Sequence, residues 1–347
     1  MPVLRVAIAD SNSDYLNRLT VVLSEYSNLQ ISQFDDQESL VKMVSNGKCK
    51  VLLLDSSMYD FNLQLDKVQV VIMLTDGKKI PDACARYRKI SKYQRIDYIY
   101  RQILEICSES LENSGSDNGG AASVISFYSP LGGCGKTSVA LITAIKMALI
   151  GKKVLYLNLE PFPSDAFFLP QTGESSLSTL LEHLSRSGDH TMYMQSCLQT
   201  KSDNLSYICH FESPNDYGAI STDELESLMD VCCHSGSFDY VLVDTAGGFD
   251  KKIQCVLGLS NQVVLVERND AISTEKLNSF IGQRYLMEEY GEKMKRVLNF
   301  DNGRGSMLQT SIPLIGQLRS VGNIDCTSLI MAKVESAESN YVQKLVE

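Results

Sequence analysis

The chain has 347 residues, a formal net charge of −10 and an apolar fraction of 44%. This length predicts two domains, and the apolar content is typical of a globular protein. The acidic balance argues against a general nucleic-acid-binding protein, which needs a basic face. The nearest basic cluster, residues 86–89 with Lys92 and Arg95, is more typical of a solvated surface.

No secretory leader is expected, because residues 1–5 lead directly into a short strand pattern. No apolar run reaches the roughly 20 residues that a bilayer span requires. The ten cysteines form no CxxC pair, so neither a disulfide framework nor a zinc site is predicted. We expect reduced, buried thiols in a cytoplasmic protein.

Residues 108–121 are rich in Gly, Ser, Asn and Asp and carry almost nothing to bury. This composition predicts a flexible linker. The linker would separate a first domain, residues 1–107, from a second domain, residues 122–347.

The first domain alternates strand patterns with helix patterns. Alternation of this kind predicts a parallel sheet with helices on both faces, and short continuous apolar runs are typical of its buried strands. The expected strands are residues 3–9, 29–34, 51–54 and 70–74, and the expected helices are residues 14–25, 37–44 and 93–106.

Polar residues stand at the ends of these strands: Asp10, Asp55 and Thr75, with Lys92 where a fifth strand would end. Ligands of such sheets bind at the carboxyl edge. The set resembles that of a response-regulator receiver domain, which has a flavodoxin-like fold. The resemblance implies that Asp55 is the phosphoacceptor, that Thr75 is the switch hydroxyl, and that Lys92 and Asp10 serve the phosphate and its Mg²⁺.

Two departures from that pattern are visible. Ser11 follows Asp10 where receivers carry a second acidic residue. Only 20 residues separate Asp55 from Thr75, and 17 separate Thr75 from Lys92, which leaves little room for complete third and fourth helices. We therefore expect a receiver-shaped scaffold used for docking, with phosphorylation of Asp55 as the alternative.

The most informative segment is residues 129–137, Ser-Pro-Leu-Gly-Gly-Cys-Gly-Lys-Thr. A strand pattern at 122–128 precedes it and a helix pattern at 138–150 follows, the context that a phosphate-binding loop requires. Lys136 would reach the β- and γ-phosphates and Thr137 would hold Mg²⁺, whereas the alternative is a surface turn. The expected nucleotide-binding residues of the loop are Gly132, Gly133, Cys134, Gly135, Lys136, Thr137 and Ser138.

A companion motif follows later in the chain. Residues 238–244 form a strand pattern that ends in Asp244, whose carboxylate can hold a water of the Mg²⁺ shell. Further strand patterns lie at 153–157, 262–266 and 296–298. Together they predict a P-loop α/β domain that takes ATP and Mg²⁺.

This domain resembles the ParA/MinD-type ATPases with their deviant Walker A loop, over residues 122–347. The resemblance implies that the end of the second strand, residues 158–160, positions the attacking water. It also implies that Asn299 contacts the adenine edge, for which its amide offers a donor and an acceptor; a loop cap is the alternative. Residues 312–318, with Gln317 and Leu318, would close over the base.

Two departures change the expected mechanism. Leu131 stands where that family has a lysine that crosses the dimer interface, and Asn158 replaces the first aspartate of the Asp-x-Asp pair. The candidate catalytic residues are therefore Lys136, Asp244 and Glu160. Because loss of a positive group at the transferred phosphate costs several powers of ten in rate, we expect ATP binding with slow or absent hydrolysis.

A receiver-like domain followed by a ParA/MinD-like domain resembles the TadZ/CpaE-like proteins. The resemblance implies an ATP-supported homodimer that localises the Tad (Flp) pilus machinery and reaches the inner membrane face or cell pole through protein partners. Neither a direct membrane anchor nor nucleic acid is expected. The alternatives are an active ParA/MinD-type ATPase in partitioning or division-site placement, and a phosphorylation-controlled regulator with an ATPase output domain.

Overall fold

The computed structural model describes residues 3–26, 28–47, 49–60, 62–77, 81–110, 120–172, 175–186, 189–320 and 326–346. They belong to two compact units: Met1–Asn118 with Arg186–Ser196, and Gly119–Ser185 with Cys197–Glu347. The sequence predicted one boundary, but the chain crosses between the units three times, at 118/119, 185/186 and 196/197.

The first unit is built on a five-stranded sheet in the order β2-β1-β3-β4-β5, with every neighbouring pair parallel. This is the flavodoxin-like order, so the predicted fold class is confirmed. The strands are β1 (Leu4–Ala9), β2 (Leu29–Phe34), β3 (Val51–Asp55), β4 (Val70–Thr75) and β5 (Arg88–Ser91). No strand pattern for β5 is readable in the sequence, because Ile90 is its one buried residue.

Alternate side chains of these strands point to opposite faces. Helices α1 (Ser13–Leu23) and α3 (Ile96–Ser110) share a core cluster with Val6 and Ile8, whereas α2 (Gln37–Ser45) shares one with Ala7. The region expected to lack complete third and fourth helices contains three 3₁₀ turns in its described residues, η1 (Ser56–Met58), η2 (Leu65–Lys67) and η3 (Asp82–Cys84).

The predicted linker is only partly described. Helix α3 continues through Ser110, so residues 108–110 are helical and do not open a linker. Burial explains this extension, because Ser108 is fully buried at the end of the helix. Residues 111–119 lie outside the described residues.

Helix α6 (His190–Cys197) is the part of the first unit that comes from a distant stretch of chain. Met192 belongs to the same core cluster as α1 and α3. The Asn28 side-chain nitrogen Nδ2 donates a hydrogen bond to Gln195 Oε1 at 3.1 Å, and this pair is buried. Residues 186–196 therefore complete the core of the receiver-like unit.

The second unit is built on an eight-stranded sheet in the order β13-β12-β11-β6-β10-β7-β9-β8, parallel except for the antiparallel pair β8–β9. The strands predicted from the sequence are present in it, whereas β8, β9 and β13 were not predicted as strands. The bounds are β6 (Ser123–Tyr128), β7 (Val154–Asn158), β8 (Leu198–Ser202), β9 (Leu205–Ile208), β10 (Tyr240–Asp244), β11 (Gln262–Arg268), β12 (Met294–Asp301) and β13 (Leu314–Arg319).

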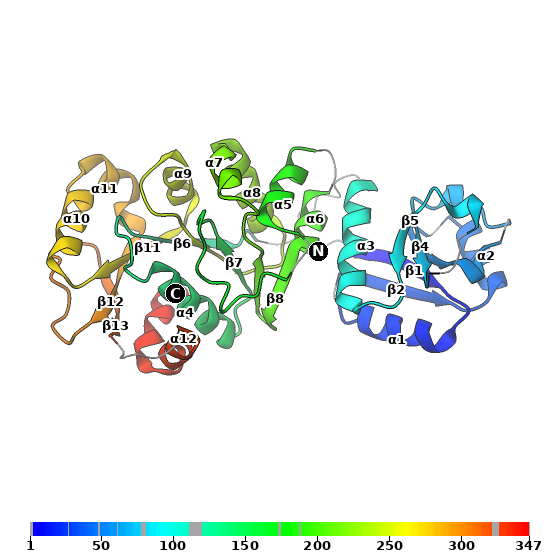
Figure 1. Ribbon diagram of the computed structural model, residues 1–347, viewed down its shortest axis with the longest axis horizontal. Coiled ribbons are helices and arrows are strands. Elements are labelled where there is room, and N and C mark those ends of the chain that lie inside the picture. The colour runs from blue at the N-terminus through cyan, green and yellow to red at the C-terminus, as the bar shows by residue number, and fades with distance from the viewer. Residues whose placement is uncertain are drawn as a thin grey trace. The chain divides into compact units, whose positions relative to one another are not determined.

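Helices cover both faces of this sheet. Helices α4 and α12 pack together on one face and α8 and α9 on the other (Figure 1). The bounds are α4 (Lys136–Leu149), α5 (Leu177–Leu184), α7 (Pro214–Ala219), α8 (Thr222–His234), α9 (Lys251–Leu259), α10 (Ala271–Ile281), α11 (Arg284–Tyr290), η4 (Gly291–Lys293), α12 (Cys326–Glu335), η5 (Ala337–Val342) and α13 (Gln343–Val346).

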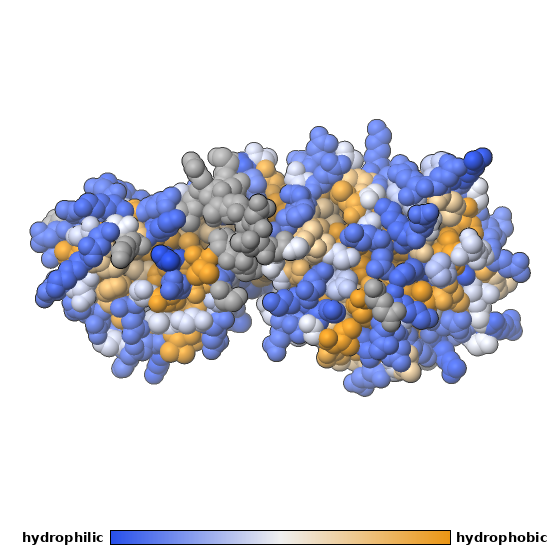
Figure 2. All heavy atoms as spheres, turned by 180° about the vertical axis from the view of Figure 1, so that it is seen from behind, coloured by the Kyte–Doolittle hydropathy of each residue, from blue (hydrophilic) through white to orange (hydrophobic). Residues whose placement is uncertain are grey.

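The surface is mainly hydrophilic on the face shown in Figure 2, where hydrophobic residues appear as separate patches. Within the described ranges, no helix has both the length and the apolar character that a bilayer crossing demands.

The contribution of α6 can be tested with Met192→Ala. Met192 is 9% exposed, and removal of a buried methionine side chain costs about 2–5 kcal/mol. We expect faster amide hydrogen exchange in α1 and α3, with little change in β6 and β10, because packing is lost in one unit only. Met331→Ala on α12, where the side chain is 38% exposed, is the matched control. Unchanged exchange in α1 and α3 would show that α6 does not support this core.

Candidate functional site

The loop between β6 and α4 has a backbone suited to an anion. Gly133 and Gly135 adopt positive φ values of 67° and 81°, which glycine accepts without steric cost. Gly135 is the N-cap of α4 and supplies no side-chain cap. The first N–H groups of the helix therefore remain for another acceptor, in the positive field of the helix dipole.

Two side chains fix the shape of this loop. Ser129 Oγ donates to the Val266 carbonyl at 2.7 Å. Asn299 Nδ2 donates to the Cys134 carbonyl at 3.0 Å. The sequence predicted an adenine contact or a loop cap for Asn299; its bond to the loop is observed, and the adenine contact stays a prediction. The role of Ser129 was not predicted, since a serine after a strand carries no specific signal.

The remaining loop residues differ in exposure. Gly132 and Gly133 are exposed, and Thr137 and Ser138 are half-buried at the start of α4. Leu131 is 7% exposed and belongs to the core cluster of the second unit. The position at which the related ATPases carry a lysine is thus part of the apolar core in this chain.

Lys136 is the centre of charge at this edge of the sheet. Its Nζ lies 2.6 Å from Glu160 Oε1 and 2.8 Å from Asp244 Oδ1, and its side chain is 7% exposed. Burial lowers the pKa of Lys136, but the two carboxylates outweigh burial and raise it above its usual value. The ammonium group therefore stays charged, and it donates hydrogen bonds to the carboxylates of Glu160 and Asp244.

Asp244 lies at the end of β10 and is fully buried. Its Oδ1 faces Lys136, and its Oδ2 accepts a hydrogen bond from Tyr156 Oη at 3.2 Å. Burial, followed by the charge of Asp244, raises the pKa of Tyr156 well above its usual value, so the phenol remains a donor. Tyr156 was not predicted, because the sequence shows it only as one apolar residue of β7.

The two polar residues after β7 have different roles. Glu160 reaches Lys136, whereas Asn158 Oδ1 accepts from the Glu160 backbone N–H at 2.9 Å and shapes the turn. Burial raises the pKa of Glu160, Lys136 opposes this, and Asp244 adds to it, so the net shift is upward. Of the predicted catalytic residues, Lys136 therefore contacts both Asp244 and Glu160, and Asn158 supports the turn that carries Glu160 through the backbone.

A cavity of ≈ 700 Å³ opens where β12 and β13 end. Gln317 lines it, and its predicted place near the base stays a prediction. Leu318 is 1% exposed and belongs to the core, so it supports the strand from inside. The other lining residues are Asp301, Gly303, Arg304, Gly305, Arg319, Ser336, Ala337 and Glu338.

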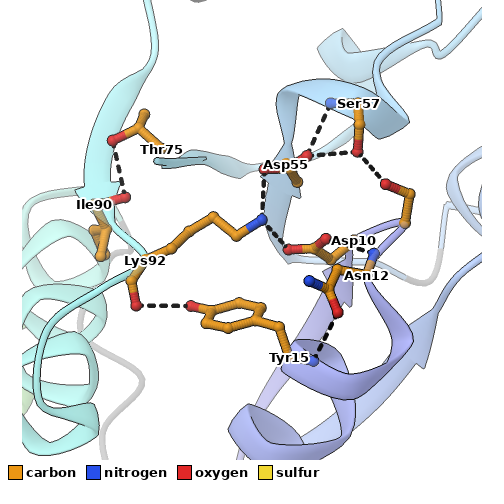
Figure 3. Close-up of polar contacts among 9 residues, drawn as sticks. Asp10, Asn12, Tyr15, Asp55, Ser57, Thr75, Ile90 and Lys92 are labelled. Atoms are coloured by element: carbon orange, nitrogen blue, oxygen red, sulfur yellow. Dashed lines mark hydrogen bonds and ion pairs between the residues drawn. The ribbon is translucent and has the colours of Figure 1, made fainter. Parts of the chain in front are cut away.

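The first unit contains a second buried lysine at a carboxyl edge (Figure 3). Lys92 Nζ lies 2.5 Å from Asp10 Oδ2 and 2.9 Å from Asp55 Oδ2. All three side chains are at most 9% exposed. The strands β1 and β3 and the end of β5 thus bring together three of the four predicted residues.

Asp55 is held on both carboxylate oxygens. Its Oδ1 accepts from the backbone N–H of Ser57 at 2.9 Å and from the Ser57 hydroxyl at 2.5 Å. Burial raises the pKa of Asp55, but the hydrogen bonds from Ser57 and Lys92 outweigh it, so the pKa is lowered. Thr75 is not part of this contact, since its Oγ1 donates to the Ile90 carbonyl at 3.4 Å (Figure 3).

The ring of Tyr15 also contacts the Lys92 ammonium group. The sequence analysis did not predict a role for Tyr15. Lys92 Nζ lies 4.9 Å from the centroid of its ring, and its hydroxyl donates to the Lys92 carbonyl at 3.3 Å. A cation over an aromatic face is attracted to it. Burial raises the pKa of Tyr15 to about 12, so it is uncharged at neutral pH.

Comparison with known proteins identifies the first unit. The family model described as "TadZ-like, receiver domain" matches residues 2–108. This unit is a TadZ-like receiver domain. The resemblance to a receiver, which was based on Asp10, Asp55, Thr75 and Lys92, is confirmed. A comparison with curated proteins finds no match.

Solved structures match the fold of the P-loop unit. A ParA family ATPase from Chlorobium tepidum TLS has a TM-score of 0.55 and 17% identity, and the match covers 65% of this chain and 98% of that one. The MinD cell division protein of Aquifex aeolicus has a TM-score of 0.50 and 18% identity, over 65% and 97%. The septum site-determining protein MinD of Pyrococcus horikoshii OT3, complexed with Mg-ADP, has a TM-score of 0.51 and 14% identity, over 65% and 96%.

At these identities the likeness shows the fold, a ParA/MinD-type α/β sheet, which confirms the predicted architecture. The chain thus joins a TadZ-like receiver domain to a domain with a ParA/MinD-type fold.

The ion pairs of Lys92 predict a strong, pH-dependent effect of Lys92→Met. Removal of one partner leaves two buried carboxylates uncompensated, which costs about 3–5 kcal/mol in unfolding free energy at pH 7. Protons that bind the unpaired carboxylates at low pH relieve their repulsion, so the cost is expected to shrink as the pH falls. Calorimetric unfolding at pH 7 and pH 4 measures both effects.

Lys42→Met is the matched control, because Lys42 pairs with Glu38 on the surface and is 71% exposed. Its expected cost is below about 0.5 kcal/mol at either pH. Equal costs for the two variants would contradict a structural role of the buried pair.

Proposed function

We propose that the second unit binds ATP and Mg²⁺ at residues 129–137 and that the bound nucleotide stabilises a homodimer with slow or absent hydrolysis. The observation that carries this proposal is the buried ammonium of Lys136, placed after a glycine loop and beside a helix N-terminus without a side-chain cap. Such an arrangement binds a polyanion, because N–H groups, helix dipole and ammonium act on the same site.

The residues present fit the nucleotide and its metal. Lys136 and the loop N–H groups would hold the phosphates, and the Thr137 hydroxyl and the Asp244 carboxylate would hold Mg²⁺, in part through water. When bound, Mg²⁺ would neutralise part of the phosphate charge. The MinD of Pyrococcus horikoshii OT3, which has a similar fold, was solved with Mg-ADP, and this supports the proposal.

Weak hydrolysis follows from three side chains. Leu131 is apolar and buried, so it supplies no charge to a partner's phosphates. Asn158 carries an amide, which cannot act as a general base. Glu160 is held by Lys136 and would have to leave it before it could orient a water. Rate enhancement at such sites depends on groups placed at the developing charge.

The family of the first unit supports a role in the Tad (Flp) pilus machinery. We infer that the receiver-like unit docks protein partners of that machinery and that the chain is cytoplasmic, recruited by them to the inner membrane face or cell pole. Phosphorylation of Asp55 is the less favoured alternative, because both its oxygens are committed to Lys92 and Ser57. The net charge of −10 disfavours a nucleic-acid surface.

Sedimentation with and without Mg-ATP, with phosphate release measured on the same sample, tests the proposal. We expect a shift from monomer to dimer with negligible release, because nucleotide can stabilise one state by its differential affinity for that state. Lys136→Ala is expected to abolish the shift. Steady phosphate release typical of P-loop ATPases would favour partitioning or division-site placement instead.

A second variant tests the competition at Lys136. Glu160→Gln removes a charged partner that the phosphates must displace, and a hydrogen bond to a charged group contributes about 1.5–3 kcal/mol. We therefore expect at least about tenfold tighter ATP binding by calorimetric titration. Glu288→Gln, at a surface glutamate that pairs with Arg284 on α11, is the control. Weaker binding in Glu160→Gln would mean that Glu160 assists the nucleotide.

A further inference from the structure

Phe300 has an unusual backbone. Its φ of 53° is the only positive value among the non-glycine residues that the structure describes. A bulky side chain in the left-handed region is strained, and such strain persists where surrounding contacts hold it and is common at ligand-binding positions.

The contacts of Phe300 lie at the phosphate-binding loop. A Cβ atom added to Gly135 would lie 3.2 Å from Phe300 Cε2 and 3.4 Å from Cζ, so the ring lies against the loop. The preceding residue, Asn299, bonds the loop carbonyl of Cys134. The strained backbone at Phe300 thus brings two consecutive side chains, Asn299 and Phe300, against the phosphate-binding loop.

Phe300 is not buried by this contact. The residue remains 38% exposed, although an aromatic ring in the core would be covered. The Arg268 guanidinium at the end of β11 lies 5.5 Å from the centroid of its ring and supports it through a cation–π contact. Directly after Phe300 the chain lines the cavity at the end of β12, beginning with Asp301.

We propose that Phe300, supported by Arg268, is the surface on which the base of the bound nucleotide stacks. The inference rests on the proposed binding of ATP at residues 129–137. A partly exposed aromatic ring next to a phosphate-binding loop and a cavity suits a flat heteroaromatic ring whose phosphates occupy the loop. Stacking uses the face of the ring, so this surface would accept purines in general and add affinity for the base.

The chain contains no tryptophan, which allows a direct spectroscopic test. Phe300→Trp places a single indole at the proposed surface, and ATP is expected to quench its emission by stacking. Inorganic tripolyphosphate, which has no base, is expected to leave the emission unchanged. Tyr285→Trp on α11, where the residue is 55% exposed, is the matched control and should respond to neither ligand.

Affinity gives the second readout. Phe300→Leu keeps an apolar side chain against Gly135 but removes the aromatic face. Since stacking on an aromatic side chain contributes a factor of about 5 to 150 in Kd, ATP binding should weaken by that factor, while the Kd of tripolyphosphate should stay unchanged.

The outcomes separate the two proposals. If ATP and tripolyphosphate both fail to bind the unaltered chain, nucleotide binding and the stacking surface are both overturned. If both ligands bind but Phe300→Leu weakens them equally, or ATP does not quench Phe300→Trp, the stacking surface is overturned and nucleotide binding stands. Should Phe300→Leu not fold, the quenching of Phe300→Trp decides.

Discussion

The ion pairs of the buried Lys136 ammonium are the interaction on which the second unit depends. Its parallel sheet directs carboxylates to one edge, where the Asp244 side chain is fully buried and the Glu160 side chain is 21% exposed. Buried carboxylates without a cation are costly, and Lys136 provides that cation. The first unit meets the same constraint in the same way, with Lys92 between Asp10 and Asp55.

The two lysines nevertheless have different surroundings. The Tyr15 ring packs against the Lys92 ammonium group, and Ser57 donates a hydrogen bond to Asp55. These contacts are typical of a cluster that stabilises the fold. Lys136 begins a helix whose N-cap residue, Gly135, supplies no side-chain acceptor, so an anion can compete for the ammonium group. The same electrostatic arrangement is therefore compatible with the proposed docking role of the first unit and with the proposed binding of an anion by the second.

Sequence patterns predicted the elements with strong local signals. Continuous apolar runs located β1, β3, β6 and β10. The short spacing of Asp55, Thr75 and Lys92 predicted that full helices would not fit between them, and the described residues there form 3₁₀ turns. Strands β5, β8, β9 and β13 were not found, because they are short and polar residues or glycine interrupt their apolar residues. The membership of residues 186–196 in the first unit was also missed, since it depends on contacts such as Asn28 with Gln195, 167 residues apart.

The sequence by itself determined the chemistry available: a glycine loop ending in Lys136 and Thr137, an acid at the end of β10, and a receiver-like set in which Ser11 replaces an acid. Tertiary structure decided how those groups are used. Lys136 meets partners 24 and 108 residues away because β6, β7 and β10 are parallel neighbours whose ends align. Likewise, only the folded backbone turns Phe300 toward Gly135. Distances between side chains on separate strands depend on register and sheet order, which no local pattern encodes.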